Sequence, residues 1–244
     1  MIAALRLFQS MGLVVADMKD LLNKIHHADC LEFMKQLPDK CVDLILTDPP
    51  YGEQTHKGAI KNKENDLQID FASITEETML QLTSEFLRLS RTWVIFTCEW
   101  RFMSAIEKAF PVEFIRFGVW VKPNYMPQMT GDRPATGWEA VCIMHPKGRK
   151  KWNGGGKCSV WEFKRDNQPN IHTTQKPLQF WKQLLLDFNT IAGGIVLDCF
   201  SGSGTTALAC HDLGLDFICI EKDADYHAAS VERLEQHKRQ LRLL

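Results

Sequence analysis

The tetrapeptide Asp48-Pro49-Pro50-Tyr51 directly follows the apolar run 42–47. It places a carboxylate, a carbonyl oxygen stiffened by the prolines and an aromatic ring within four residues. The two oxygens accept hydrogen bonds and the ring offers a stacking surface, so the motif suits a flat base that carries an exocyclic amino group. The alternative interpretation is a turn that ends a strand and buries the tyrosine.

A second motif, residues 195–207, combines a strand, a glycine-rich turn and the start of a helix. Gly202 and Gly204 allow a tight turn and a close approach of the backbone to a ligand. Thr205 opens a helix whose free N–H groups face that ligand. Glu221 ends the next strand, where an acidic group is placed to bind ribose hydroxyls. The segment is therefore predicted to bind a nucleotide.

The position of this turn in the chain bears on the kind of nucleotide. Its glycine spacing also fits a nicotinamide or flavin domain. Only residues 221–244 remain after the second strand, enough for one helix at 225–241 but too few for the remaining strands of a dinucleotide fold. Strands from earlier in the chain must therefore complete the sheet.

The elements that position these motifs follow an alternating pattern of strands and helices, which is typical of a doubly wound α/β sheet. With 244 residues and 45% hydrophobic content, the chain can form one well-buried domain with a small appendage. A capping box at 73–76 and the proline at 177 each predict the start of a helix. Strands are expected at 24–28, 42–47, 92–97, 114–121, 139–145, 194–198 and 216–220, and further helices at 207–213 and 225–241.

In this order the motifs resemble the DNA amino-methyltransferases that use S-adenosylmethionine, and among them the β group, in which the catalytic motif precedes the cofactor motif. The resemblance covers roughly residues 24–234. It implies a mostly parallel, seven-stranded, Rossmann-like sheet that is circularly permuted and carries a small DNA-recognition appendage. The motifs that carry the resemblance are Ala28-Asp29-Cys30, Asp48-Pro49-Pro50-Tyr51-Gly52, Trp120-Val121-Lys122-Pro123, the segment His172 to Pro177, the segment Asp198 to Thr206, and Glu221.

The expected domain organisation follows from where the resemblance begins. Residues 1–17 are expected to form an N-terminal extension, and residues 18–244 the methyltransferase domain. Within that domain, residues 146–171 are expected to form a target-recognition insert.

The chemistry of an adenine amino group suggests roles for the tetrapeptide. Asp48 and the Pro49 carbonyl are suited to accept the N6 hydrogens, Pro50 stiffens the motif, and Tyr51 is suited to stack on a base flipped out of the duplex. The resemblance implies S-adenosylmethionine as the cofactor. Its binding residues are expected to be Asp29, Cys30, Thr174, Lys176, Asp198, Phe200, Gly202, Gly204, Thr205 and Glu221.

The first residue of the catalytic motif bears on the target base. Relatives that act on cytosine N4 usually carry Ser in place of Asp48, so the sequence favours adenine N6. Cytosine N4, RNA or a protein amide stays an alternative, and so does a catalytically silent DNA-binding module. Loss of catalysis would predict a damaged tetrapeptide or glycine turn, and neither is damaged.

A basic stretch is the candidate surface for DNA. The formal net charge of the chain is −1, yet residues 147–165 hold seven basic residues against one acidic residue, a net charge of +6. A merely solvated face is the alternative. Segments 52–70 and 124–137 lack periodicity and are the other places where DNA is expected. The residues predicted to bind DNA are Lys147, Arg149, Lys150, Lys151 and Lys157.

Composition also indicates the cellular compartment and the partners of the protein. The eight cysteines form no Cys-x-x-Cys pair and no zinc-like spacing, so we expect a cytoplasmic protein without a metal site. Gln9 and Ser10 interrupt the apolar stretch 1–16, and no apolar span of membrane length follows. DNA is the expected partner. A homodimer is expected, because a small appendage would contact little DNA by itself. A cognate restriction endonuclease is a further possible partner.

Overall fold

A computed structural model describes residues 18–52, 74–166, 175–189 and 191–241. In this part of the chain the central feature is an eight-stranded sheet of order β1-β8-β7-β2-β3-β5-β4-β6. The seven predicted strands are confirmed, and β6 is an additional one. The strands are β1 (Lys24–His27), β2 (Leu44–Thr47), β3 (Val94–Cys98), β4 (Phe114–Val121), β5 (Trp138–Met144), β6 (Val160–Glu162), β7 (Ile195–Asp198) and β8 (Asp216–Glu221).

The sheet is mostly parallel, as predicted. Strand β5 runs antiparallel to both of its neighbours, β3 and β4, and the other pairs are parallel. Every residue of β2 and β3 is buried, as expected for strands covered on both faces.

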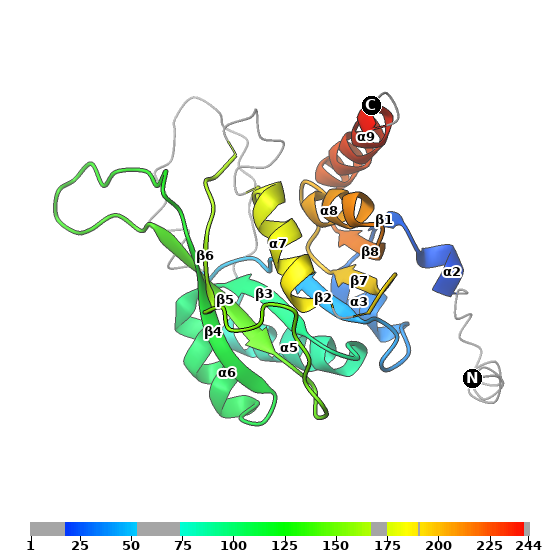
Figure 1. Cartoon of the computed structure of the whole chain (residues 1–244), viewed down its shortest axis with the longest axis horizontal. Helices are drawn as coiled ribbons and strands as arrows, with labels where there is room; N and C mark the ends of the chain where they lie inside the picture. Colours follow the sequence, from blue (N-terminus) through cyan, green and yellow to red (C-terminus); the bar gives the residue numbers. More distant parts are fainter. Residues whose placement is uncertain (1–17, 53–73, 167–174, 190, 242–244) are drawn as a thin grey trace.

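Helices cover both faces of the sheet, and Figure 1 shows the two layers. One face packs against α3 (Cys30–Lys35), α5 (Glu76–Leu89) and α6 (Met103–Ala109). The other face packs against α7 (Leu178–Phe188), α8 (Thr205–Leu213) and α9 (Ala224–Leu241). The short helix α2 (Met18–Leu21) precedes β1, and the 3-10 helix η1 (Trp100–Phe102) precedes α6. The expected doubly wound α/β architecture is confirmed.

Local sequence explains where α5 begins. The Thr75 hydroxyl caps the helix by accepting a hydrogen bond from the Thr78 N–H at 3.2 Å. Ser73 of the predicted capping box lies outside the described residues. The buried face of the helix is Met79, Leu82, Thr83, Phe86 and Leu89.

The described part of the expected recognition insert, residues 146–166, is built into the α/β domain. Strand β6 pairs with β4, and Trp161 on β6 is 5% exposed. Trp161 and Trp152 pack against Phe188 at the end of α7, with ring centroids 6.1 and 5.6 Å apart. None of the helices in the described ranges is long and apolar enough to cross a membrane.

Candidate active site

The carboxyl ends of three neighbouring strands bring the two sequence motifs together. Strands β8, β7 and β2 are consecutive and parallel, so the residues at and after their carboxyl ends line one edge of the sheet. Asp48 follows β2, Asp198 ends β7 and Glu221 ends β8. Ligands of open α/β sheets bind at such an edge. We call it the Asp48 edge.

Asp48 is held by two side chains. Its Oδ1 accepts a hydrogen bond from Thr97 Oγ1, and its Oδ2 accepts one from Lys176 Nζ. The side chains of Asp48 and Lys176 are 20% and 6% exposed. Burial raises the pKa of the Asp48 carboxyl, and the Lys176 ammonium opposes that rise. The carboxylate is therefore fixed in orientation by its two hydrogen bonds.

Glu139 on β5 is a second carboxylate in the same group. It accepts hydrogen bonds from the Tyr51 hydroxyl at 2.8 Å and from Lys122 Nζ, and its Oε2 lies 3.4 Å from Lys176 Nζ. Burial favours the neutral acid, but the two ammonium groups and the Tyr51 hydroxyl lower the pKa of Glu139 to about 2. The negative charges of two carboxylates thus balance the positive charges of two ammonium groups in one partly buried cluster. We call it the Asp48 cluster, and it comprises Asp48, Glu139, Lys122 and Lys176.

Sequence analysis placed Lys122 only in a family-like motif, and it missed Glu139. A single acidic residue inside the apolar segment 139–145 was the available signal, because Glu is seldom buried without a partner. Lys176 was predicted to bind the cofactor. The structure places its ammonium on Asp48 and 5.6 Å from the centre of the Tyr51 ring, and its role in cofactor binding stays a prediction. Thr174 lies outside the described residues.

Asp198 is 3% exposed and lies beneath the glycine turn. Its Oδ1 accepts hydrogen bonds from Thr47 Oγ1 at 2.7 Å and from the Phe200 N–H at 3.0 Å, and its Oδ2 accepts one from Thr206 Oγ1 at 2.5 Å. Burial raises the pKa of this carboxyl to about 6, although the hydrogen bonds oppose the rise. The carboxylate therefore joins β2, β7 and the first turn of α8.

The glycine turn has the backbone conformation that its residues predict. Gly202 and Gly204 have φ of 49° and 78°, in the left-handed region that favours glycine. The Gly202 N–H donates to Glu221 Oε2 at 2.7 Å, and Thr205 Oγ1 donates to the Lys176 carbonyl at 3.3 Å. The turn thus contacts both the ribose-binding candidate and the segment that carries Lys176.

The strand ends next to this turn hold the remaining cofactor candidates. Strands β1 and β8 are paired, which brings Asp29 and Cys30 close to the end of β8. Asp29 caps α3 and lies 3.1 Å from Lys222 Nζ, and Phe200 packs against the core cluster that contains Cys30. Burial raises the pKa of the Cys30 thiol to about 12, so this side chain offers a neutral contact.

These residues fit an adenosine-containing cofactor. Gly202 and Gly204 leave the backbone of the turn without side chains, so a ligand can approach it closely. Glu221 supplies an acceptor for hydroxyl groups at the adjacent strand end. No group of three or more His, Cys, Asp or Glu side chains in the described ranges is arranged to hold a metal ion.

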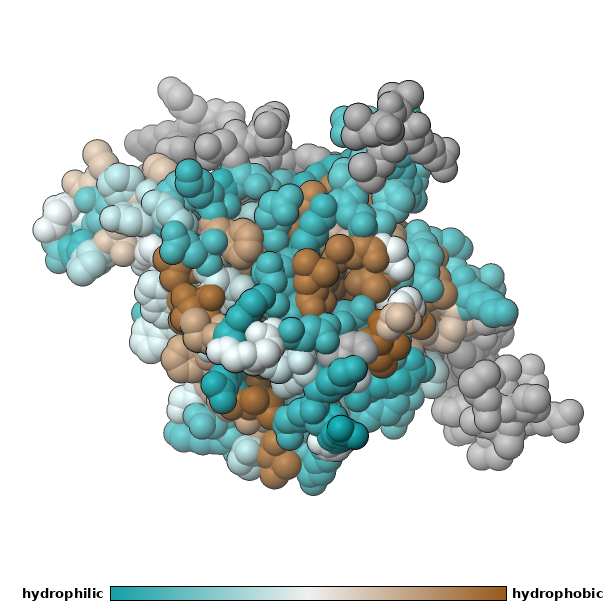
Figure 2. Space-filling model, in the orientation of Figure 1, coloured by the Kyte–Doolittle hydropathy of each residue, from teal (hydrophilic) through white to brown (hydrophobic). Residues whose placement is uncertain are grey.

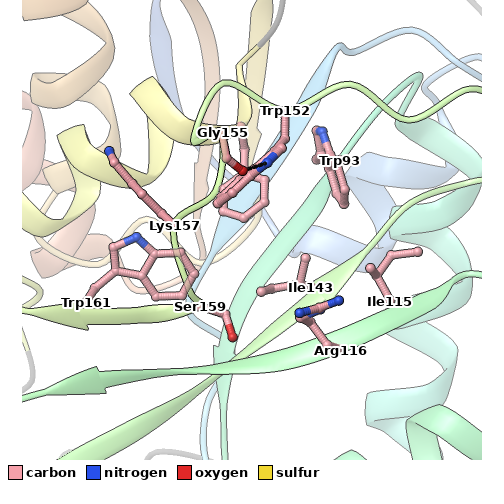
Figure 3. A pocket seen from close by; sticks show the side chains of 10 residues that line it. Trp93, Ile115, Arg116, Ile143, Trp152, Gly155, Lys157, Ser159 and Trp161 are labelled. Carbon is pink, nitrogen blue, oxygen red and sulfur yellow. Dashed lines mark hydrogen bonds between the residues drawn. The ribbon is translucent and has the colours of Figure 1, made fainter.

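The structure does not bring the predicted DNA-binding residues to the Asp48 edge. Met144, at the end of β5, pairs with Val94 at the start of β3, so the basic stretch that follows begins at the opposite edge. The Lys151 carbonyl there accepts a hydrogen bond from Trp93 Nε1 at 2.7 Å. Figure 3 shows Lys157 beside a cavity of about 290 Å³ walled by tryptophans at this edge. DNA contact by Lys147, Arg149, Lys150, Lys151 and Lys157 stays a prediction.

Fold and site together define a Rossmann-like methyltransferase. The model of a DNA methylase family, named for the N6 and N4 amino groups, matches residues 42–232, so the chain belongs to this family. It is 25% identical over 260 residues to the type II methyltransferase M.HinfI of Haemophilus influenzae, covering 91% of this chain and 71% of the relative. It is 24% identical to M2.MboI of Moraxella bovis, covering 87% of each chain.

Solved structures show the same fold. The complex of M1.HpyAVI with S-adenosylmethionine has a TM-score of 0.66 and 28% identity, covering 86% of this chain and 98% of the other. The cytosine-N4-specific PvuII DNA methyltransferase has a TM-score of 0.65 at 14% identity, covering 88% and 91%, which is a likeness of fold alone. The predictions of fold class, of a DNA amino-methyltransferase and of S-adenosylmethionine as cofactor are confirmed.

Proposed function

We propose that the chain methylates adenine N6 at a defined sequence in DNA, by direct transfer to a base flipped out of the duplex. The observation that carries this proposal is the Asp48 carboxylate, held by Thr97 and Lys176 next to Tyr51. Cytosine N4 is the second candidate, because the fold is also similar to that of PvuII DNA methyltransferase, which is described as cytosine-N4-specific.

The Asp48 motif addresses the weak nucleophilicity of an adenine amino group. The lone pair of N6 is delocalised into the ring, so the nitrogen must become pyramidal before it can attack. Asp48 and the Pro49 carbonyl accept the two N6 hydrogens, and the carboxylate stabilises the positive charge that develops on nitrogen. The raised pKa of Asp48 suits it to take up the proton that the methylated nitrogen releases. The cofactor supplies a methyl group activated by its sulfonium.

Lys176 must change partner before Asp48 can act in this way. Its Nζ contacts Asp48 Oδ2, one of the two oxygens available to the N6 hydrogens. Glu139 Oε2 lies 3.4 Å from the same ammonium and offers a second position for it. We infer that Lys176 moves towards Glu139 when the base enters, because an ammonium facing the developing positive charge would oppose transfer.

The cofactor is assigned to the ends of β1, β8 and β7. Glu221 binds its ribose hydroxyls, while Asp29 and Cys30 lie towards its adenine. The turn from Gly202 to Thr205, together with Phe200, contacts its methionine part. Asp198 contributes by holding the turn, since its two oxygens accept hydrogen bonds from two hydroxyls and a backbone N–H.

DNA is assigned to the Asp48 edge, where the target base must arrive. The basic residues Lys147 to Lys157 follow β5 at the opposite edge, so they would contact a different part of the DNA from the segment that holds the target base. A homodimer, a cognate restriction endonuclease and a cytoplasmic setting stay predictions.

The test is to identify the labelled nucleoside. The protein is incubated with tritiated S-adenosylmethionine and unmethylated duplex DNA, which is then digested to nucleosides. Label in N6-methyldeoxyadenosine supports the proposal. Label in N4-methyldeoxycytidine would replace it by the second candidate, and unlabelled DNA would overturn both.

A further inference from the structure

The connection between β4 and β5, residues 122–137, projects away from the sheet (Figure 1). We call it the projecting loop. The Lys122 N–H donates to the Gly137 carbonyl at 2.8 Å and closes its base. Lys122 and Glu139, at the two ends of the loop, belong to the Asp48 cluster. The loop therefore begins and ends at the candidate active site.

The base of the projecting loop is fixed to the domain. Asn124 Nδ2 donates to the Arg165 carbonyl at 3.1 Å, and the Arg165 N–H donates to Asn124 Oδ1 at 2.8 Å. The Tyr125 ring lies over Gly137, where an added Cβ would be 3.2 Å from the ring. These contacts fix the direction in which the loop leaves the sheet.

Polar side chains at the tip of the loop are engaged with one another. The Gln128 carboxamide and the Thr130 hydroxyl are 3.0 Å apart, and Thr130 Oγ1 donates to Asp132. Arg133 lies 2.9 Å from Asp132. The acidic charge of the tip is thus paired, which removes a source of repulsion for a phosphate backbone.

Apolar side chains of the same loop are exposed. Tyr125, Met126 and Met129 are 50%, 70% and 82% exposed, and Figure 2 shows pale brown residues among hydrophilic ones on this projecting segment. The two methionines, 70% and 82% exposed on one projecting segment, give it apolar surface that a partner can cover. Because the loop is continuous with the Asp48 cluster, its partner is the substrate that reaches Asp48.

We propose that Met126 and Met129 insert into the base stack of duplex DNA and fill the space that the flipped target base leaves. This inference rests on the proposed transfer to a flipped base. Proteins that unstack DNA use apolar side chains, methionine among them, as wedges between bases. The unbranched methionine side chain adapts to an irregular gap, which suits a space bounded by whichever bases neighbour the target. The loop therefore stabilises the open duplex and does not take part in methyl transfer.

The test compares two duplexes that share the methylated sequence, which is read first from DNA that the protein has labelled. One duplex is fully paired, and the other has an abasic site opposite the target base, so that flipping costs less. The double variant Met126→Ala/Met129→Ala is expected to lose about tenfold in kcat/KM on the paired duplex. On the abasic duplex it is expected to match the wild type.

Two controls separate insertion from general effects. Met126→Leu/Met129→Leu keeps apolar volume and is expected to keep activity on both duplexes. Val112→Ala removes a side chain that is 59% exposed before β4, at the opposite edge, and is expected to change neither rate.

Equal losses on the two duplexes would show that the loop only binds DNA, and an unchanged rate on the paired duplex would show that it is not needed. Either result would overturn the proposal that Met126 and Met129 insert into the base stack. Wild-type protein that labels no DNA would instead overturn the proposed function.

Discussion

Lys176 contacts the carboxylates of Asp48 and Glu139, with its Nζ hydrogen-bonded to Asp48 Oδ2 and 3.4 Å from Glu139 Oε2. Glu139 lies on β5, Asp48 directly follows β2, and Lys176 precedes α7. Burial works to lower the pKa of Lys176, but the two carboxylates raise it above its usual value. Lys176 therefore stays charged, and under the proposed function its choice of partner controls whether Asp48 is available to a substrate.

Lys176→Met should shift the pH dependence of transfer. The ammonium opposes the rise that burial imposes on the pKa of Asp48, so its removal raises that pKa further. Asp48 must be ionised to accept N6 hydrogens, and the acid limb of kcat against pH should therefore move to higher pH. The profile is measured from single-turnover rates. Lys182→Met is the control, because it removes an ion pair between Lys182 on α7 and Asp212 on α8, away from Asp48. An acid limb that stays in place would contradict the coupling.

Glu139→Gln should destabilise the protein in a pH-dependent way. The folded-state pKa of Glu139 is lowered from 4.5 to about 2, chiefly by Lys176 and Lys122 acting against burial. Its stabilising contribution is therefore full above pH 4.5 and is lost as the pH falls towards 2. Denaturant unfolding should show a large difference between wild type and variant at pH 7 and a smaller one at pH 3. Gln81→Ala, on the exposed face of α5, removes no titratable group and should show no such trend. An equal difference at both pH values would contradict the ion-pair assignment.

Glu221→Ala and Gly202→Val should each weaken binding of S-adenosylmethionine to the free protein. The first variant removes an acceptor for hydroxyls, and the second forces a branched side chain into a φ of 49°. Isothermal titration calorimetry measures the affinity. Gly156→Ala is a matched control, since no heavy atom lies within 4 Å of an added Cβ there. Unchanged affinity in both variants would show that the cofactor does not bind at this turn.

Lys150→Ala/Lys151→Ala tests the basic stretch. If these residues bind phosphates, the slope of log affinity against log salt should fall by about one unit for each phosphate that the variant no longer neutralises. Turnover at saturating DNA should not change, because the stretch begins at the edge opposite Asp48. Filter binding on long duplexes over a range of salt gives the slope. A slope equal to that of the wild type would show that the stretch is only solvated.

Strands β2, β5 and β7 could be predicted because their buried runs are largely apolar and are flanked by Gly, Pro or Asp. Strand β6 could not, since it has three residues and only Trp161 among them is buried. The contact between Asp48 and Lys176 joins residues 128 positions apart, and no periodicity reports it. The count of charged residues identified the basic stretch but could not show at which edge of the sheet it begins. That edge is set by the direction of β5, which runs antiparallel to β4 because the two consecutive strands pair as a hairpin.

The central claim is that the Asp48 carboxylate accepts the hydrogens of the target amino group. Asp48→Ala is compared with wild type in single-turnover methylation of duplex DNA, with calorimetry confirming that S-adenosylmethionine still binds. The account predicts a loss of about 100-fold to 1,000-fold in the rate of transfer, the usual effect of removing a group that stabilises a transition state. A variant that keeps more than about a tenth of the wild-type rate would contradict it, because so small a loss does not match such a role.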